Sequence, residues 1–323
     1  MYTIERYSIE RKTLWDEFVS KAKNSTFLFF RAYMDYHSER FEDHSLLIFR
    51  DGKLIGLLPA NQEKDAIISH GGLTYGGFVL GPQVRFGDVL SGFQGVLQYF
   101  DDLKINRFSI KCMPRIYHRS PSDEIDYLLF KLNADRYRSD NLSVVIPKEA
   151  IYSRDRMQGV KRGKKHGLKV EETNDLESFW NQILIPNLDQ KHQSKPVHSL
   201  SEIQLLKSRF PKKIRQFNVY DQDGKIVAGT LIYDTERVAR SQYISGNNDK
   251  NTLGSLDFLH DHLLQKVFKD KPYFDFGKSN ENEGQVINEG LLYWKEGFGA
   301  RSVTHDYYHI DPSSHTKLNA VMI

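Results

Sequence analysis

Cysteine, long apolar runs and an excess of one charge sign are all scarce in this sequence of 323 residues. Its single cysteine, Cys112, excludes an internal disulfide and a cysteine-rich metal site. No apolar run approaches the roughly 20 residues of a membrane-spanning helix. The charged opening stretch MYTIERYSIERK also lacks the apolar segment of a signal peptide. From these features we expect a cytoplasmic protein.

Metal-ligand spacing and the common catalytic loops are also missing. His260 and His262 lie two positions apart and would diverge on a helix. No P-loop and no nucleophile elbow occurs. We therefore expect no bound metal and no serine nucleophile of the hydrolase type.

Charge is nearly balanced, with 45 basic and 42 acidic residues and a net charge of +3. This mild excess suits anionic small molecules, whereas a nucleic-acid partner usually brings a stronger basic patch. The densest basic run, Lys161–Lys169 (KRGKKHGLK), is typical of a solvated helix face. Contact with phosphate groups of a ligand is the second interpretation. A nucleic-acid arm is disfavoured because no aromatic residues are interleaved with the basic ones.

The chain is 39% hydrophobic and 27% charged, so it can build ordinary cores, and its length allows two domains. Hydrophobic periodicity predicts an α/β fold (an α+β mixed sheet). The expected strands are Tyr2–Ile9, Ser45–Arg50, Lys53–Ala60, Ala66–Ser69, Leu73–Leu80, Arg107–Met113, Leu142–Ile146, Leu168–Glu172, Gln216–Tyr220, Lys225–Tyr233, Ala239–Ser245, Tyr273–Gly277 and Ser302–Ile310. The expected helices are Lys12–Lys23, Phe27–Phe41, Asp88–Leu103, Asp123–Ala134, Tyr152–His166, Leu176–Leu184, Ser255–Phe268 and one ending at Gly297.

An ordered internal echo indicates two copies of one α/β unit. DGKLIGLL (Asp51–Leu58) resembles DGKIVAGTLI (Asp223–Ile232), and Asp-Gly between apolar runs predicts a hairpin in each. RFSIKCMP (Arg107–Pro114) occupies the place that YFDFGKSN (Tyr273–Asn280) occupies later. We therefore expect two domains, residues 1–150 and 151–323.

The stretch Tyr273–Ala300 reads as a strand, a polar loop and a helix. Ile287, Leu291, Trp294 and Phe298 fall at helical spacing and predict one apolar face. The polar loop follows the carboxyl end of a strand, where open α/β sheets usually bind ligands.

Asp275 lies inside the apolar strand of this stretch, between Phe274 and Phe276. A carboxylate there must be exposed on one face or paired. We weigh two interpretations, a contact to the substrate amine and a structural pair with Lys278 or Lys295.

The second half of the chain resembles the GNAT acyltransferase superfamily. The strand RSQYIS (Arg240–Ser245), the loop Gly246–Leu253 and the helix start Gly254-Ser255 look like the segment that holds the pyrophosphate of acyl-CoA. A helix N-terminus offers free N–H groups and positive dipole to phosphate. The family's closing small residue is replaced by Leu256. The resemblance implies acyl-CoA as co-substrate and the contact residues Tyr243, Ser245, Gly246, Lys250, Gly254, Ser255 and Asn280.

A second match is Tyr293-x-x-x-Gly297-Phe298. It is similar to the GNAT ending in which a tyrosine protonates the departing thiolate of CoA. The family places an asparagine seven residues earlier, where this chain has Val286, with Asn288 nearby. The resemblance implies Tyr293 as the catalytic acid.

The whole chain resembles the tandem-GNAT, FemAB-like branch found in bacterial polysaccharide clusters. The resemblance rests on SHGGLTYGG (Ser69–Gly77), KPVHSLSEI (Lys195–Ile203), DFGKSNE (Asp275–Glu281), Asn288-Glu289 and KEGFG (Lys295–Gly299). It implies transfer of an acyl group from acyl-CoA to the amine of a nucleotide-linked amino sugar, such as a dTDP sugar, in O-antigen, capsule or lipopolysaccharide synthesis.

Within that resemblance, amine acylation needs a base, an oxyanion site and an acid. His198 or a water is the candidate base, since histidine side chains in general titrate near neutral pH. The alternative for His198 is a hydrogen bond to sugar hydroxyls or to a backbone group. The implied catalytic residues are His198, Asp275 and Tyr293. The implied substrate contacts are Tyr75, His118, Lys195, Gln242, Glu281, Asn288 and Lys295. Core packing is the alternative for Tyr75, and a solvated loop is the alternative for His118, Asn280 and Glu281.

Two other functions stay open. A FemAB-type aminoacyl transferase would use aminoacyl-tRNA, which the low net charge and the lack of a long charged heptad segment disfavour. A non-catalytic carbohydrate-binding protein of the same fold is the other alternative, and a homodimer is also open. Asp275 and Asn280 have no counterpart in the earlier SIKCMP, so we expect the second domain to transfer the acyl group and the first to shape the acceptor pocket.

Overall fold

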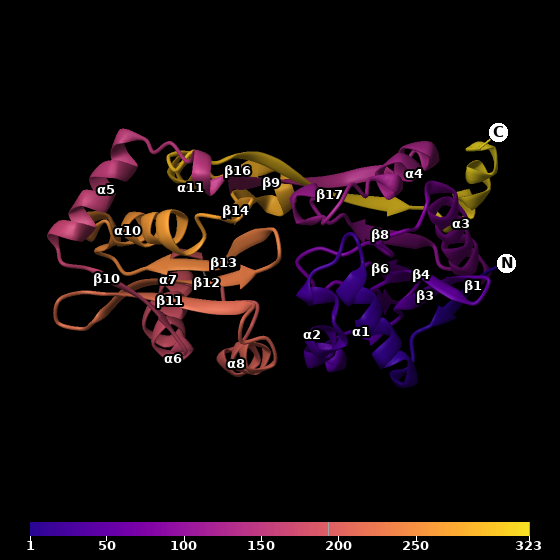
Figure 1. Cartoon of the computed structure of the whole chain (residues 1–323), viewed down its shortest axis with the longest axis horizontal. Helices are drawn as coiled ribbons and strands as arrows, with labels where there is room; N and C mark the ends of the chain where they lie inside the picture. The colour runs from indigo at the N-terminus through magenta and orange to yellow at the C-terminus, as the bar shows by residue number, and fades with distance from the viewer. Residues whose placement is uncertain (193, 323) are drawn as a thin grey trace. The chain divides into compact units, whose positions relative to one another are not determined.

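The computed structural model describes residues 1–192 and 194–322 and shows a mixed α/β chain of two compact units (Figure 1). Unit 1 comprises Met1–Asp140 and the C-terminal segment from Thr304, and unit 2 comprises Asn141–Val303. The expected boundary at residue 150 therefore falls inside unit 2. The C-terminal segment joins unit 1 because strand β17 pairs with β8, placing Tyr307 opposite Lys111.

Unit 1 contains an antiparallel sheet in the order β1 (Tyr2–Arg6), β3 (Leu46–Arg50), β4 (Lys53–Leu58) and β7 (Val79–Leu80). A second strand set runs β2 (Glu42–Asp43), β5 (Asn61–Glu63), β6 (Ala66–Ile68), β8 (Arg107–Lys111) and β17 (Arg301–Ile310). Its helical elements are η1 (Ile9–Arg11), α1 (Lys12–Lys21), η2 (Phe27–Phe29), α2 (Arg31–Met34), η3 (Asp35–Arg40), α3 (Phe86–Asp102), η4 (Arg115–Tyr117), α4 (Glu124–Leu132) and η9 (Pro312–Ala320). Helix α3 packs on β1, β3 and β4 through a fully buried row that includes Phe93, Leu97 and Phe100.

Unit 2 is built on the antiparallel strands β10 (Lys169–Thr173), β11 (Ile214–Tyr220), β12 (Ile226–Asp234) and β13 (Val238–Gly246). Strand β14 (Tyr273–Lys278) runs parallel to β13, and β9 (Asp135–Val145) runs antiparallel to β14. The helical elements are η5 (Pro147–Glu149), α5 (Arg154–Lys165), α6 (Leu176–Phe179), the π-helical turn η6 (Trp180–Leu184), α7 (Ile185–His192), α8 (Leu200–Arg209), α9 (Lys250–Leu253), α10 (Ser255–His262), the π-helical turn η7 (Leu263–Val267), η8 (Asn282–Gly284) and α11 (Glu289–Glu296).

The helices of unit 2 cover both faces of its sheet (Figure 1). Helices α5 and α10 lie on one side, and α6 and α8 lie on the other. The core between α10 and the sheet gathers Leu259, Leu263, Phe274 and Phe276. A loop and α9 follow the carboxyl end of β13. The segment that ends in α11 follows the carboxyl end of β14.

Both predicted hairpins are confirmed. Asp51 and Gly52 have positive φ angles of 49° and 75°, which a two-residue turn of the I′ kind requires. Gly224 has φ 77° in the second hairpin. Local turn chemistry alone therefore fixes these two connections.

Three predicted elements differ from the structure. Between residues 73 and 80 only β7 is a strand, because the glycine-rich stretch before it makes a single isolated bridge, Gly76 to Cys112. The segment 27–41 forms three short helical turns in place of one helix. Helix α11 begins at Glu289, so Ile287 lies in the short strand β16 (Val286–Ile287), which pairs with β15 (Asn280–Glu281). Ile287 and Leu291 are exposed, and only Trp294 and Phe298 of the expected apolar face pack inward.

Within residues 1–192 and 194–322, no helix is both long enough and apolar enough to cross a membrane.

Candidate functional site

Strands β13 and β14 of unit 2 pair only at their beginnings. The parallel register runs from Val238 opposite Tyr273 to Arg240 opposite Asp275, and no pairing continues beyond that point in the described residues. Strand β13 nevertheless extends to Gly246 and remains paired with β12. Among the described residues, no strand pairs with the edge of residues 241–246 that faces away from β12.

A β-bulge marks the point of divergence. Leu231 of β12 pairs with Tyr243 and Ile232 pairs with Ser241, so Gln242 is the extra residue on β13. A bulge bends a strand and redirects its side chains, and bulges occur often next to active sites. We treat this bulge and the unpaired edge that follows it as the candidate site, and name it the divergence site (Figure 1).

An ion pair closes the paired end of the divergence site. Asp275 is fully buried and forms an ion pair with Arg240, the residue opposite it in the register. Its second oxygen accepts a hydrogen bond from the Gly277 N–H at 2.6 Å. Arg240 is an ion-pair partner of Asp275 because parallel pairing places the two residues directly opposite each other, whereas the sequence suggested Lys278 or Lys295. The Asp275 charge also acts on Lys295.

Lys295 is a buried amine beside this pair, only 2% exposed. Its Nζ donates hydrogen bonds to the carbonyl oxygens of Gly277 at 3.0 Å and Lys278 at 2.6 Å. Burial lowers the pKa of Lys295 to about 7, and the Asp275 carboxylate partly opposes that shift. Lys295, predicted to bind substrate, holds the backbone where β14 leaves the sheet.

His198 and Tyr243, which the sequence analysis assigned to different roles, lie together. The His198 Nδ1 and the Tyr243 Oη are 2.7 Å apart, and the Tyr243 oxygen also accepts from the His198 backbone N–H at 3.2 Å. Trp180 Nε1 donates to the His198 carbonyl at 3.4 Å, and its ring packs edge-on against Tyr243. Since Tyr243 follows the bulge residue directly, this arrangement connects the histidine to the divergence site.

Several buried polar atoms on the same strands lack hydrogen-bond partners among the described residues. They are Ser143 Oγ and Asn141 Oδ1 on β9, Ser241 Oγ and Gln242 Oε1 on β13, and Ser279 Oγ just after β14. Buried polar atoms are normally satisfied, so such a group is typical of a site that a ligand or water completes. Of these residues the sequence analysis identified only Gln242. A serine within or just after an apolar strand was the available signal for Ser143, Ser241 and Ser279.

Tyr293, the predicted acid, lies on the surface of α11 with 57% of its area exposed. Its hydroxyl donates to Asp155 Oδ2 of α5 at 2.7 Å, and this hydrogen bond raises the pKa of Tyr293. The phenol therefore keeps its proton at neutral pH. The neighbouring Trp294 anchors the helix, because its Nε1 donates to Asp257 at 2.8 Å.

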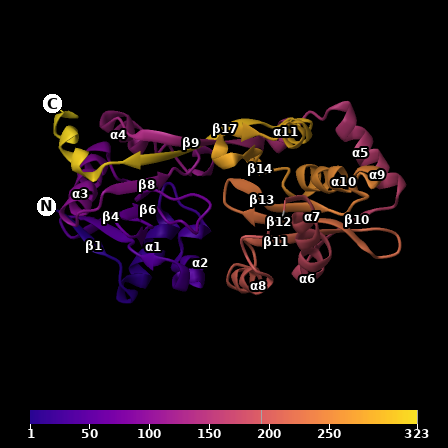
Figure 2. The ribbon, with the colours of Figure 1, turned by 180° about the vertical axis from the view of Figure 1, so that it is seen from behind.

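The predicted pyrophosphate segment is packed against another helix. Gly254 has φ 67°, and a Cβ built there would overlap the Gly159 carbonyl oxygen of α5. Gly159 and Gly163 let α5 approach α10 closely, and Figures 1 and 2 both show the two helices side by side. Ser255 is fully buried, and its Oγ finds no partner in the described part of the chain. Helix α5 thus covers the N-terminus of α10, which narrows the approach for a phosphate group.

The other predicted acyl-CoA contacts surround this segment. Ser245 and Gly246 are buried at the end of β13, and Ser245 Oγ lies 3.5 Å from the Ile183 carbonyl. Lys250 begins α9 and is partly exposed. In the short strand β15, Asn280 Oδ1 accepts from the Asn141 N–H at 2.6 Å.

The predicted substrate contacts near α11 hydrogen-bond to one another. Asn288 caps α11 by accepting from the Leu291 N–H at 2.9 Å, and its Nδ2 donates to Glu281 at 2.8 Å. Lys195 is exposed in the segment before His198. These contacts fix the loop that follows β14, and Glu281 stays exposed.

Two predicted substrate contacts, Tyr75 and His118, belong to unit 1. Tyr75 is 2% exposed, donates to Thr26 Oγ1 at 3.0 Å and packs on Tyr117, as the core-packing alternative expected. His118 is buried, so it is not in a solvated loop, and burial lowers its pKa. Its Nε2 has no hydrogen-bond partner among the described residues.

Comparison with solved structures gives full-length matches. The crystal structure of FemX superposes with a TM-score of 0.66 at 11% identity, covering 98% of this chain and 99% of FemX. The fold is FemX-like. L-PGS from Bacillus licheniformis matches with a TM-score of 0.58 at 12% identity, over 98% of this chain and 96% of that one. A tandem GNAT protein from the clavulanic acid biosynthesis pathway gives 0.50 at 10% identity, over 97% and 99%.

These likenesses confirm the predicted fold class, an α/β chain of tandem GNAT-like domains. At 10–12% identity they establish the fold alone. No model of a known protein family matches the sequence, and no curated protein matches it either.

Proposed function

We propose that the protein is an acyltransferase that acylates an amine at the divergence site. The observation that carries the proposal is the parting of β13 from β14 after Arg240 and Asp275, with the bulge at Gln242 beside it. An unpaired strand edge can bind an extended acyl donor through backbone hydrogen bonds, as a β-strand partner would. The same N–H groups can stabilise the oxyanion of a tetrahedral intermediate.

The acyl donor we propose is acyl-CoA, and the acceptor is the amine of a nucleotide-linked sugar, with dTDP as the nucleotide. This finer assignment follows the sequence resemblance to sugar N-acyltransferases of polysaccharide clusters. The unsatisfied polar atoms of Ser241, Gln242 and Ser279 suit the hydroxyl groups of a sugar. We place the protein in O-antigen or capsule synthesis on the same ground.

The proposed reaction is a direct attack without a covalent enzyme intermediate. The neutral amine adds to the thioester carbonyl and gives a tetrahedral oxyanion. Collapse of this intermediate breaks the C–S bond and forms the amide. The nitrogen loses one proton and the departing thiolate takes one, so this step involves no net change in protons. His198, in contact with Tyr243, is the proposed base that removes the proton of the ammonium group. Tyr293 is the proposed acid because it matches the tyrosine of the GNAT ending, and its hydroxyl donates to Asp155 at 2.7 Å.

The test is an assay of thiol release from acetyl-CoA and longer acyl-CoAs with dTDP- and UDP-linked amino sugars. We expect release that depends on an amino sugar and that His198→Ala lowers by about a hundredfold, the usual contribution of one general base. The matched control is His166→Ala, at the exposed end of α5. Full activity of His198→Ala would contradict the role of base, and no release with any donor would contradict the choice of acyl-CoA.

A second candidate, an aminoacyl transferase that uses aminoacyl-tRNA, is favoured by two observations. The superposition on FemX, with a TM-score of 0.66, exceeds the 0.50 found for the tandem GNAT protein. Helix α5 also packs against Gly254 at the expected pyrophosphate position. Activity that needs charged tRNA and disappears on RNase treatment would support this candidate over acyl-CoA.

A further inference from the structure

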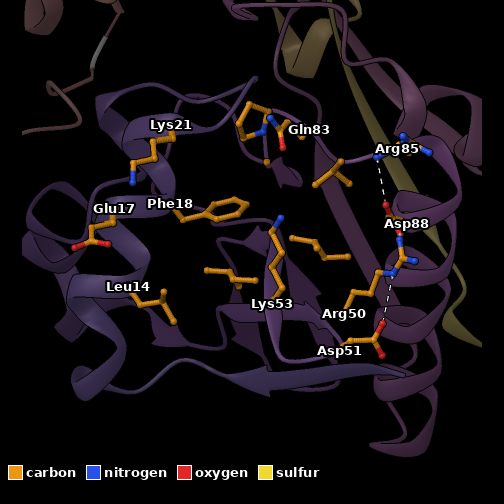
Figure 3. Close-up of a pocket in the computed structure, with 15 residues that line it drawn as sticks. Leu14, Glu17, Phe18, Lys21, Arg50, Asp51, Lys53, Gln83, Arg85 and Asp88 are labelled. Carbon is orange, nitrogen blue, oxygen red and sulfur yellow. Dashed lines mark hydrogen bonds and ion pairs between the residues drawn. The ribbon is translucent and has the colours of Figure 1, made fainter.

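Unit 1 contains a cavity of about 800 Å³ formed wholly by its own residues. Helix α1, the β3–β4 hairpin and the segment Gly81–Asp88 that enters α3 form its three sides (Figure 3). Its volume lies in the range of small-molecule sites, which is roughly 300–1,000 Å³. None of its lining residues belongs to the divergence site or to the predicted substrate contacts, so its role goes beyond the proposed transfer.

The floor of the cavity is apolar. Leu14 and Phe18 of α1, Leu54 of β4 and Val84 remain partly exposed while facing this concave surface. Gly81 shapes the floor, because a Cβ there would meet Val84 at 3.0 Å and Phe18 at 3.4 Å. Apolar side chains gathered in a hollow become covered when a ligand with an apolar body binds.

The rim of the cavity carries positive charge that the protein does not neutralise. Among the described residues, the ammonium groups of Lys21 and Lys53 form no ion pair and no hydrogen bond. Figure 3 shows Lys53 rising into the middle of the cavity near Phe18, with Lys21 on the α1 side. Glu17 is the acidic group of the lining that opposes them without an ion pair of its own in the described structure.

Arg50, Asp51 and Asp88 of the lining are engaged in ion pairs. Arg50 forms ion pairs with Asp88 and, at 3.7 Å, with Asp51. Asp88 also accepts from the Tyr2 hydroxyl at 3.1 Å and from the Arg85 N–H at 3.4 Å at the start of α3. The helix N-terminus is therefore already occupied by a carboxylate, and Figure 3 shows the Arg85 side chain on the α3 side, pointing away from Lys21 and Lys53. The two lysines are thus the cations that face an incoming anion.

We propose that this cavity binds a small amphipathic anion. Its ring or short chain lies on Phe18 and Leu54, and its phosphate, carboxylate or sulfonate group contacts Lys53 and Lys21. The apolar floor supplies burial, and the lysines supply charge complementarity. Because both lysines are exposed, salt weakens this binding. Two unneutralised lysines are too few to bind the backbone of a nucleic acid. We therefore assign a small ligand to this cavity.

The experiment titrates 1-naphthyl phosphate into the full chain by isothermal calorimetry, with 1-naphthol and inorganic phosphate as comparison probes. We expect saturable binding at one site, with both comparison probes weaker by about tenfold or more, since each lacks one half of the recognised chemistry. The double variant Lys21→Glu/Lys53→Glu should weaken binding of 1-naphthyl phosphate by about tenfold or more. The matched control Lys104→Glu, exposed and outside the cavity lining, should bind within about twofold of the wild type.

A second variant tests the floor. Leu54→Trp fills the space beside Phe18 and should also weaken binding of 1-naphthyl phosphate by about tenfold. If this variant does not fold, the exposed lysine variants decide alone. The proposal is overturned if 1-naphthyl phosphate does not saturate at roughly millimolar concentration. It is also overturned if the double lysine variant binds as the wild type does, or if 1-naphthol binds equally well. None of these results depends on transferase activity, so they leave the proposed function to its own assay.

Discussion

Replacing Lys295 with methionine should change how the stability of the protein depends on pH. The ammonium group is 2% exposed, and burial lowers its pKa from 10.5 to about 7. Between these two pH values the unfolded chain binds a proton that the folded chain does not bind. The free energy of unfolding of the wild type therefore rises with pH in this window, by at most about 1.4 kcal/mol per pH unit. Below it both states are protonated, and the full cost of the buried charge is present.

Over the whole window the free energy of unfolding of the wild type rises by about 5 kcal/mol. This is the shift in the pKa of Lys295 multiplied by the free energy of one pH unit. The variant has no titrating group at this position, so its stability lacks this dependence. It also loses the hydrogen bonds to the carbonyls of Gly277 and Lys278, which lowers its stability by a nearly constant amount at all pH values. The effect of the buried charge is therefore measured by how the stability difference between wild type and variant changes with pH, and not by the size of that difference at one pH.

The assay is urea unfolding of the wild type and of Lys295→Met at a series of pH values between about 6 and 9. From about pH 7 to about pH 9 the wild type should gain roughly 2–3 kcal/mol relative to the variant. Lys269→Met, which removes an exposed lysine of the same unit, should show a flat difference. A constant difference for Lys295→Met, or one that shrinks as the pH rises, would refute the reasoning.

Three further predictions concern packing, the buried ion pair and the proposed acid. Gly254→Ala should lower the free energy of unfolding by more than about 2 kcal/mol, because the added methyl group overlaps Gly159. Gly224 has a similar φ but open space around it, so Gly224→Ala should lower the free energy of unfolding by about 1 kcal/mol. Chemical denaturation measures both values. Asp275→Leu should cost about 3–5 kcal/mol by leaving the Arg240 charge buried, and adding Arg240→Met should restore part of that loss in the same experiment. Tyr293→Phe, at an exposed position, should keep the melting temperature but lower kcat about a hundredfold with KM little changed; an unchanged kcat would remove Tyr293 as the acid.

Local sequence chemistry was sufficient for the regular elements that depend on near neighbours. The two Asp-Gly hairpins form because glycine accepts the positive φ angles that a tight turn requires. Helices α1 and α3 follow from apolar residues at helical spacing, and each lies within two residues of its predicted bounds. The stretch 73–80 differed because its glycines supply no side chains to pack on a sheet, and only β7 forms.

Contacts between distant residues could not be read in the same way. The sequence showed that Asp275 needs a partner, but only the parallel register of β13 and β14 selects Arg240. Likewise, Gly254 read as the start of a helix that holds pyrophosphate, and the structure shows it packed against Gly159 of α5, almost a hundred residues earlier in the chain.

The sequence by itself determined most of the element types, the two hairpins and the repeated order of elements that indicated two copies of one α/β unit. These features depend on backbone preferences and hydrophobic periodicity over a few residues. Only the tertiary structure decided where β13 parts from β14, which buried charges pair, and that Lys295 lies inside the protein. Those properties depend on strand register and burial, which arise when segments far apart in the chain pack together.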